Sequence, residues 1–419
     1  MKNRILIIFM LLPLLAGAQV KKPINFNDYI EQVRQKNLVY AAEKLNISLA
    51  DASLRSAKLF NDPSLSIEYA NNDDHRMQMG QGMSVELSKT FSIGKRLSRI
   101  DLALSEKDMS IALLDDFFRN LRAEATVAYI EAIKQTDLYK VKLSSYNSIN
   151  ELAKADSIKF ALGKITEVDA MQSRIEAGVI HNELLQASND LYSSYAALNI
   201  PLGQFHADTL YVPIGVLDIG SREFVRGDLL FMALDNRSDL AAALKNVDVA
   251  QKALKLAHRE RGIDFDLSLG YNHNTTVRNE IAPAPRFNGM TIGIAIPLKF
   301  SNFNRATLQT ANIKANQAEK YYLQAQTEVQ TEVTQNYNTY ISLSFQMKQF
   351  NSGMLDESEA VLNGKTYSYH RGETSLLDVL NAQRTYNDVQ ALYIETLFNY
   401  ACSLINLEKS VGIWDITIK

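Results

Sequence analysis

The alternation of apolar and polar residues predicts long helices interrupted by pairs of short strands. Outside the strand segments the chain contains few breaks, with only 18 glycines and eight prolines in 419 residues, and this favours long uninterrupted helices. The helices expected are, in chain order, 27–60, 95–163, 166–200, 226–260, 304–371 and 375–410. The same order of elements therefore occurs twice: a helix, two strands, a very long helix, a turn and a final helix.

Between the first two helices of each half, short segments alternate strictly between apolar and polar residues. In the first of these, Leu65, Ile67 and Tyr69 are separated by polar residues. This period of two predicts strands with one apolar face, in hairpins at 63–91 and 263–298. If the strands enter a membrane, the residues expected to face lipid are Leu65, Ile67, Tyr69, Val85, Leu87, Phe265, Leu267, Leu269, Ile292 and Ile294.

The two halves of the chain also match each other residue by residue. The matched pairs begin with Ala42 and Ala242, Ala50 and Ala250, Leu54 and Leu254, and Ala57 and Ala257. Matches about 200 residues apart continue in order, which indicates one duplication of a large unit rather than a short solenoid repeat. The expected organisation is a first repeat at 19–203, a linker or equatorial segment at 204–225, a second repeat at 226–412 and a tail at 413–419.

The first 18 residues have the pattern of an export signal. Lys2 and Arg4 precede an apolar run at 5–15, which ends in Ala16, Gly17 and Ala18. A charged segment, a short apolar segment and a small-residue cleavage site are typical of a signal peptide. We therefore expect a signal peptide at 1–18. A retained membrane anchor is the alternative, although the run is short for a membrane span.

Composition excludes several classes of function. The chain has 419 residues, of which 22% are charged, and a net charge of −3, a balance that argues against nucleic-acid binding. A single cysteine, Cys402, excludes an internal disulfide framework and a cysteine-based metal site. The histidines lack the spacing of zinc motifs, and no phosphate-binding loop or nucleophile elbow is present. We expect no enzymatic activity, no resident metal and no cofactor.

The number of strands predicts an oligomer if the strands are transmembrane. Four strands cannot close a barrel, and an open sheet would leave unpaired edges in lipid. Three copies would supply 12 strands, an even number suited to an antiparallel barrel. The expected fold class is mainly α with a transmembrane β-barrel: a long antiparallel α-helical barrel plus four strands per protomer, in a homotrimer. A soluble coiled-coil rod with a small sheet is the alternative.

Several motifs resemble those of a known family. The segments 163–169 (GKITEVD) and 372–378 (GETSLLD) share the pattern G-x-x-[ST]-x-x-D. The segment 91–96 (FSIGKR) resembles a strand-to-helix junction, and 61–65 (NDPSL) resembles the approach to a first strand. On these residues, essentially the whole mature chain resembles the TolC-type outer membrane efflux proteins, also called outer membrane factors. Residues 62–71 and 94–96 are most similar to the heavy-metal, CzcC/CusC-like branch.

The resemblance implies a passive exit duct in the bacterial outer membrane, extending into the periplasm. Such a channel of a tripartite efflux system receives substrates from a periplasmic adaptor, the membrane fusion protein, and an inner-membrane pump. The implied partners are two further copies of the chain, outer membrane lipid, the adaptor and a pump of the RND type, and no nucleic acid. The alternative is an exported periplasmic coiled-coil tether without a pore.

The two turns that carry the shared motif are the candidate functional sites. From the residues alone, Thr166 with Asp169 and Ser375 with Asp378 have the spacing of capping boxes. The resemblance implies that these turns also form the periplasmic entrance. It assigns adaptor docking to Gly163, Lys164, Thr166, Gly372, Glu373 and Ser375, and a periplasmic gate to Tyr369, Asp378, Asn381, Asp169 and Gln172.

Within this candidate gate, one role stays open. Asp378 is expected either to line the pore, in a ring of three carboxylates that would favour cations, or only to cap its helix. By resemblance Tyr369 is a gate tyrosine, with Asp169 as its polar partner. Thr374 stands where some members carry a gate arginine, and Asn381 where they carry a second aspartate. These two differences argue against a charge-locked gate.

A loop expected on the extracellular side contains possible metal ligands. His75, Met77 and Met79 lie close together with Asp73 and Asp74 between the first two strands. Methionine and histidine suit soft cations, but a solvated loop is the simpler interpretation, and no metal site is predicted there.

Overall fold

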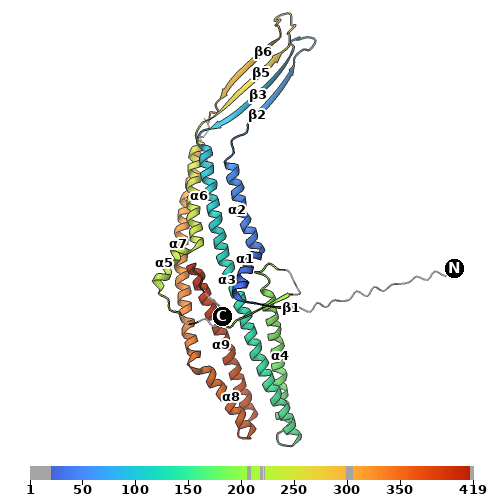
Figure 1. The fold of residues 1–419 in the computed structure, drawn as a ribbon, viewed down its shortest axis with the longest axis vertical. Helices are drawn as coiled ribbons and strands as arrows, with labels where there is room; N and C mark the ends of the chain where they lie inside the picture. Colours follow the sequence, from blue (N-terminus) through green and yellow to red (C-terminus); the bar gives the residue numbers. More distant parts are fainter. Residues whose placement is uncertain (1–19, 205–208, 218–219, 221, 299–304, 416–419) are drawn as a thin grey trace, which may run out of the picture. The chain divides into compact units, whose positions relative to one another are not determined.

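The structure, a computed structural model, describes residues 20–204, 209–217, 220, 222–298 and 305–415 (Figure 1). The expected signal peptide at 1–18 and parts of the expected linker and tail lie outside the described residues. The chain divides into two compact units, which are considered separately. Unit 1 comprises Met1–Ala41, Phe118–Ala233 and Glu332–Lys419, and unit 2 comprises Ala42–Phe117 and Leu234–Thr331.

Unit 2 contains an antiparallel sheet of four strands in the order β2-β3-β5-β6 (Figure 1). The strands are β2 (Ser64–Asn71), β3 (Gln81–Ser92), β5 (Asp264–Asn274) and β6 (Phe287–Ala295). The four strands expected from the alternation are confirmed, and within the described residues β2 and β6 are the two edges of this sheet.

The register of the sheet separates apolar from polar side chains. Leu65 lies opposite Leu87, which lies opposite Leu269, which in turn lies opposite Ile292. Directly paired residues of antiparallel strands point to the same face, so this row belongs to one apolar face. A second row on that face consists of Ile67, Val85, Tyr271 and Met290. The intervening rows, such as Ser66, Glu86, Gly270 and Thr291, form a polar face. All the residues expected to face lipid lie on the apolar face.

Two helices expected to be continuous are each broken at one residue. The first consists of α1 (Phe26–Lys36) and α2 (Leu38–Ala57), and its counterpart of α5 (Arg226–Asn236) and α6 (Ser238–Glu260). Asn37 has ψ 122° and Arg237 has ψ 123°, both far from helical values. The side chain of Asn37 accepts from the Tyr40 backbone N–H at 2.7 Å, so it caps the helix that follows.

The longest helices differ in continuity. α3 (Lys95–Ala161) runs for 67 residues without a break, or about 100 Å at 1.5 Å per residue. The counterpart expected at 304–371 is not one helix: α7 (Arg305–Gln349) and α8 (Leu355–His370) are separated by a π-helical turn, η1 (Phe350–Met354). Gly353 interrupts the helical backbone with φ 116°. The final helices are α4 (Glu167–Ala197) and α9 (Leu376–Val411).

Unit 1 also contains a parallel pair of strands that the sequence did not predict. β1 (Val20–Ile24) pairs with β4 (Thr209–Pro213). The hydroxyl of Tyr129 on α3 lies 3.0 Å from the Ile24 carbonyl oxygen and 2.6 Å from that of Ile214, so it holds both strand ends against the helix. Across the described ranges, no helix has both the length and the apolar composition needed to span a membrane. The expected fold class, mainly helical with a four-stranded domain, is confirmed for the single chain.

Candidate functional site

In unit 1 the hairpins α3–α4 and α8–α9 end in turns of the same design. Gly163 and Gly372 have φ of 72° and 78°, in the left-handed region that favours glycine. The Gly163 N–H donates to the Phe160 carbonyl oxygen at 2.8 Å, and the Gly372 N–H donates to that of Tyr369 at 3.1 Å. A side-chain Cβ at either glycine would meet nothing within 4 Å. Backbone conformation, not space, therefore requires glycine at these helix ends.

The helices after these turns begin with capping interactions. The Thr166 hydroxyl accepts from the Asp169 N–H at 3.2 Å, and Ser375 forms a complete capping box with Asp378. Asp378 also accepts from the Thr374 hydroxyl at 2.8 Å. Hydrogen bonds from Ser375 and then Thr374 lower the pKa of Asp378 to about 2. Its carboxylate is ionised at neutral pH, and its stabilising effect is lost only as the pH falls towards 2.

Tyr369, the predicted gate tyrosine, lies in a polar group inside an apolar cluster. Its hydroxyl donates to Oδ1 of Asp156 on α3 at 2.9 Å. Asp156 has no exposed surface, and its Oδ1 lies 3.5 Å from the ammonium of Lys159. That ammonium also lies 4.2 Å from the centre of the Tyr369 ring. Burial, and then the bond to Asp156, raise the pKa of Tyr369, so its hydroxyl stays a proton donor.

In this structure the hydroxyl of Tyr369 bonds Asp156 and not Asp169, and the pairing of Tyr369 with Asp169 stays a prediction. Asp169 hydrogen-bonds Thr166 at 2.7 Å, and it acts on Tyr369 only through its charge. Sequence reasoning missed Asp156, although a signal was present. Asp156 follows Ile149 and Ala153 at helical spacing, which places a carboxylate on the apolar stripe of α3.

The apolar cluster around this bond draws on four helices. Its buried residues come from α3, α4, α8 and α9: Ile149, Leu152, Ala153, Ala177, Ile180, Tyr369, Leu376, Val379 and Leu380. A second polar link joins α4 to α9, where the guanidinium of Arg384 donates to both carboxylate oxygens of Glu176 at 3.0 and 2.7 Å. The two hairpins are thus held together near their tips by apolar packing and two charged contacts.

The remaining predicted residues of the tip lie apart from this group. Asn381 and Gln172 are exposed on α9 and α4, and Lys164 is exposed in its turn. Glu373 is also exposed and pairs with Arg371 at 2.9 Å. The structure brings together Tyr369 and Asp156, and separately Asp378 with its cap.

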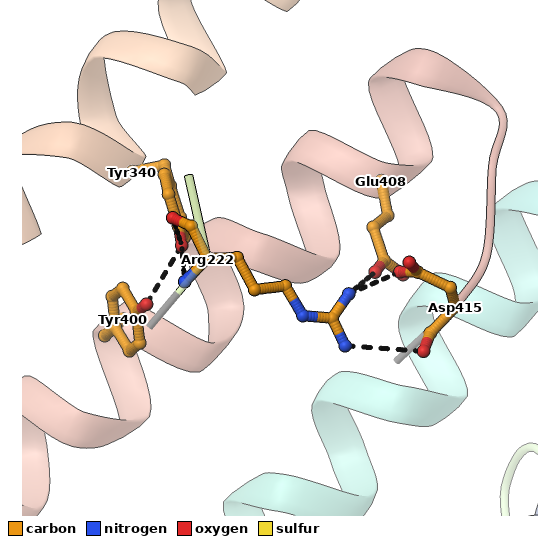
Figure 2. Close-up of polar contacts among 5 residues, drawn as sticks. All are labelled: Arg222, Tyr340, Tyr400, Glu408 and Asp415. Carbon is orange, nitrogen blue, oxygen red and sulfur yellow. Dashed lines mark hydrogen bonds and ion pairs between the residues drawn. The ribbon is translucent and has the colours of Figure 1, made fainter. Parts of the chain in front are cut away.

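A second polar group of unit 1 secures the end of α9 (Figure 2). The Arg222 guanidinium donates to Asp415 at 2.5 Å and lies 3.5 Å from the buried Glu408. Tyr340 donates to the Arg222 carbonyl oxygen at 2.8 Å, and its hydroxyl lies 3.0 Å from that of Tyr400. A hydrogen bond with Glu408, together with Arg222, lowers the pKa of Asp415. The group braces the chain end and contains none of the predicted site residues.

The loop with possible metal ligands is organised by its backbone. Asp74 accepts from the N–H groups of Arg76 and Met77 at 2.9 and 2.6 Å. The Asn279 side chain, from the loop between β5 and β6, donates to the Met77 carbonyl oxygen at 2.7 Å. Where the structure describes the chain, no three His, Cys, Asp or Glu residues form a group that could hold a metal ion.

Comparison with known proteins agrees with this architecture. The model of the outer membrane efflux protein family matches residues 229–413. The cobalt-zinc-cadmium resistance protein CzcC of Cupriavidus metallidurans is 24% identical over 378 residues, which cover 90% of this chain and 86% of that protein. The chain is thus similar to outer membrane efflux proteins. It is also 23% identical to the outer membrane protein TolC of Vibrio cholerae over 300 residues, covering 68% of this chain and 66% of that one.

Solved structures share the fold of this chain. CusC superposes with a TM-score of 0.76 at 16% identity, covering 93% of this chain and 92% of that one. The Campylobacter jejuni outer membrane channel CmeC gives a TM-score of 0.76 at 15% identity, covering 92% of this chain and 85% of that one.

Proposed function

We propose that this protein is a member of the outer membrane efflux protein family and the outer-membrane channel of a tripartite efflux system. It conducts substrates passively to the exterior, from a periplasmic adaptor and an inner-membrane pump of the RND type. The observation that carries the proposal is the sheet of unit 2, whose apolar face includes the exposed residues Leu65, Ile67 and Ile292. An exposed apolar face of this kind needs a partner, and in a member of this family lipid is the fitting one.

The two open edges of the sheet support a trimer. Within the described residues β2 and β6 each pair with one strand only, and in lipid the backbone groups of their outer edges need partners. Three copies joined β6 to β2 close a 12-stranded barrel with the polar face inside. Exposed Leu45 and Leu49 on α2, one helical turn apart, give a neighbouring copy an apolar contact in unit 2.

The tips of the hairpins serve as the periplasmic entrance in this proposal. The bond between Tyr369 and Asp156 holds α8 against α3, and its release lets the hairpins separate. Asp169, Gln172 and Asn381 line the entrance, and Asp378 combines a helix cap with a place in that lining. The exposed turns dock the adaptor through Gly163, Lys164, Thr166, Gly372, Glu373 and Ser375.

The cargo that fits best is cationic. The relative CzcC is named as a cobalt-zinc-cadmium resistance protein. On the polar face of the sheet, Glu68, Glu86 and Asp266 are not balanced by any lysine or arginine of the paired strands. The other carboxylate of that face, Asp264, pairs with Lys95. A negative lining raises the local concentration of cations.

Single-channel recording of the purified mature protein in planar bilayers tests this function. We expect small, cation-selective currents that Asp378→Ala alters if its carboxylate lines the entrance. Unaltered currents would keep the channel and leave Asp378 as a helix cap alone. Folded protein that fails to insert into bilayers would contradict the channel and favour a periplasmic tether.

A further inference from the structure

A pocket of unit 2 lies where the sheet meets the start of α3. Its volume is about 390 Å³, and its lining includes Phe60, Lys89, Phe91, Arg96, Arg99 and Phe265. Three of these side chains are cationic and three are aromatic. Among the described residues that line the pocket there is no carboxylate, so it is a concentrated positive site beside apolar surface.

Lys89 has an unusual position in the sheet. It lies in the same row as Leu267 and Ile294, on the apolar face. Among the paired residues of the four strands, it is the only Asp, Glu, Lys or Arg on that face. Its ammonium lies 5.8 Å from the ring centres of both Phe60 and Phe91. A lysine on a lipid-facing surface extends its ammonium group towards the polar headgroups. The ammonium group of Lys89 reaches this pocket.

Arg96 is held in place by the backbone. Its Nε and one Nη donate to the Lys58 carbonyl oxygen at 2.9 and 2.6 Å, and its guanidinium lies 4.2 Å from the centre of the Phe60 ring. The planar guanidinium has five N–H donors, more than this contact uses. Arg99, one turn further along α3, is exposed and adds a second guanidinium. Arginine forks of this kind match the oxygens of a phosphate group.

The apolar side of the pocket is large and exposed. Phe60 and Ile93 are 68% and 73% exposed. Phe91 and Phe265 stack with ring centres 5.4 Å apart, on the apolar face of the sheet. Beyond Lys89, this surface continues along that face through the rows of Leu87 and Val85. A ligand that suits the whole site therefore combines an anionic group with hydrocarbon chains.

We infer that this pocket binds the phosphate of an anionic phospholipid. The phosphate contacts Lys89, Arg96 and Arg99, and the acyl chains lie along Phe91 and the apolar face. Basic pockets at the membrane surface bind anionic headgroups in this way. The inference rests on the proposed function, because that function places the sheet in a membrane. The end of the sheet from which α3 begins then lies at the headgroups. A free phosphate ion would use the same cations but not the exposed aromatic surface.

Native mass spectrometry of the mature protein in mild detergent tests the inference. Phosphatidylglycerol and phosphatidylcholine with identical acyl chains are titrated separately. We expect the wild type to bind phosphatidylglycerol more tightly, and the double variant Lys89→Gln, Arg99→Gln to bind it at least about tenfold more weakly, since a hydrogen bond to a charged group is typically worth a factor of this size. Arg96 is left intact because it also binds the backbone.

The matched control removes two equal charges from α7, as Lys314→Gln, Lys320→Gln, and should keep the wild-type affinity. The single variant Arg99→Gln changes one exposed side chain and should weaken binding even if the double variant folds poorly. Equal phosphatidylglycerol binding by the double variant and the control would overturn the inference. Displacement of the lipid by millimolar inorganic phosphate would also overturn it, in favour of a free-ion site. Currents in pure phosphatidylcholine bilayers test the proposed function separately, because they require no anionic lipid.

Discussion

At the scale of single residues, the contact between Tyr369 and Asp156 contains the most deeply buried carboxylate of the candidate site. The carboxylate has no exposed surface, and within the described residues its Oδ2 has no hydrogen-bond partner. The energy of such a group depends on the few partners it has, because desolvation of a charge is costly. Removal of one partner therefore costs more than an ordinary hydrogen bond.

The variant Tyr369→Phe keeps the ring in its cluster and removes the hydroxyl donor. We expect the free energy of unfolding to fall by about 1–3 kcal/mol, because Asp156 keeps only Lys159 as a polar partner. In bilayers the closed state should be occupied less, which raises the mean conductance. Denaturant unfolding and single-channel recording measure the two effects. Tyr367→Phe, on the same helix but with an exposed hydroxyl, is the control, and equal effects of the two variants would contradict this role.

The sequence predicted the caps of the site but not this pair, for a reason of distance along the chain. Ser375 and Asp378 are three residues apart, so a short sequence motif is enough to predict their interaction. Tyr369 and Asp156 are 213 residues apart, and only the packing of α8 against α3 brings them together. A residue's neighbours in sequence carry no information about such a partner.

At the scale of elements, the long helices of the two halves differ. α3 is continuous, whereas η1 separates α7 from α8 at Gly353. The sequence did not predict this break, because one glycine inside a helical pattern is usually tolerated at a cost of about 1 kcal/mol. The breaks at Asn37 and Arg237 were not predicted for a different reason, since neither site contains glycine or proline. Asn37 caps the helix that follows and donates to the Pro201 carbonyl oxygen, whereas Arg237 is buried and pairs with Asp239. Helical periodicity reports none of these contacts.

Two glycines of the same region give a matched test of the break. Gly353→Ala should lower the free energy of unfolding by about 1–3 kcal/mol, because φ 116° is unfavourable for any residue with a Cβ. Gly364→Ala, within α8, should instead raise it by up to about 1 kcal/mol through helix propensity. Nothing lies within 4 Å of a Cβ at either position, so the comparison isolates backbone conformation. Thermal unfolding of both variants measures the difference, and stabilisation by both would show that η1 is not required.

At the scale of the whole molecule, the two faces of the sheet set what the protein contacts. The period of two in the sequence was enough to predict both faces, since alternation is a property of each strand alone. The pair β1 and β4 could not be predicted in this way. Lys21, Lys22 and Pro23 interrupt any alternation in β1, and its partner is distant in the sequence.

The charge of the polar face gives a prediction for ion permeation. The double variant Glu68→Gln, Glu86→Gln should lower the permeability ratio of potassium over chloride by about twofold or more, because these carboxylates attract cations at short range. Reversal potentials in asymmetric potassium chloride measure the ratio. Glu280→Gln, in the loop between β5 and β6, removes a carboxylate outside the strands and should leave the ratio unchanged. A ratio that does not differ between the variants would exclude selectivity by this face.

The pairing of β3 with β5 also limits when the sheet can form during synthesis and export. The two strands are contributed by opposite halves of the chain, and Gln81 and Thr275, which hydrogen-bond next to this pairing, are 194 positions apart. During synthesis and export the β2–β3 hairpin is therefore finished long before its neighbour emerges. Contacts between such distant residues form slowly, and an apolar hairpin with a bare edge invites aggregation while it waits. The first half of the chain must reach the membrane unfolded or escorted, and in a chain truncated before β5 the edge of β3 that does not face β2 stays unpaired.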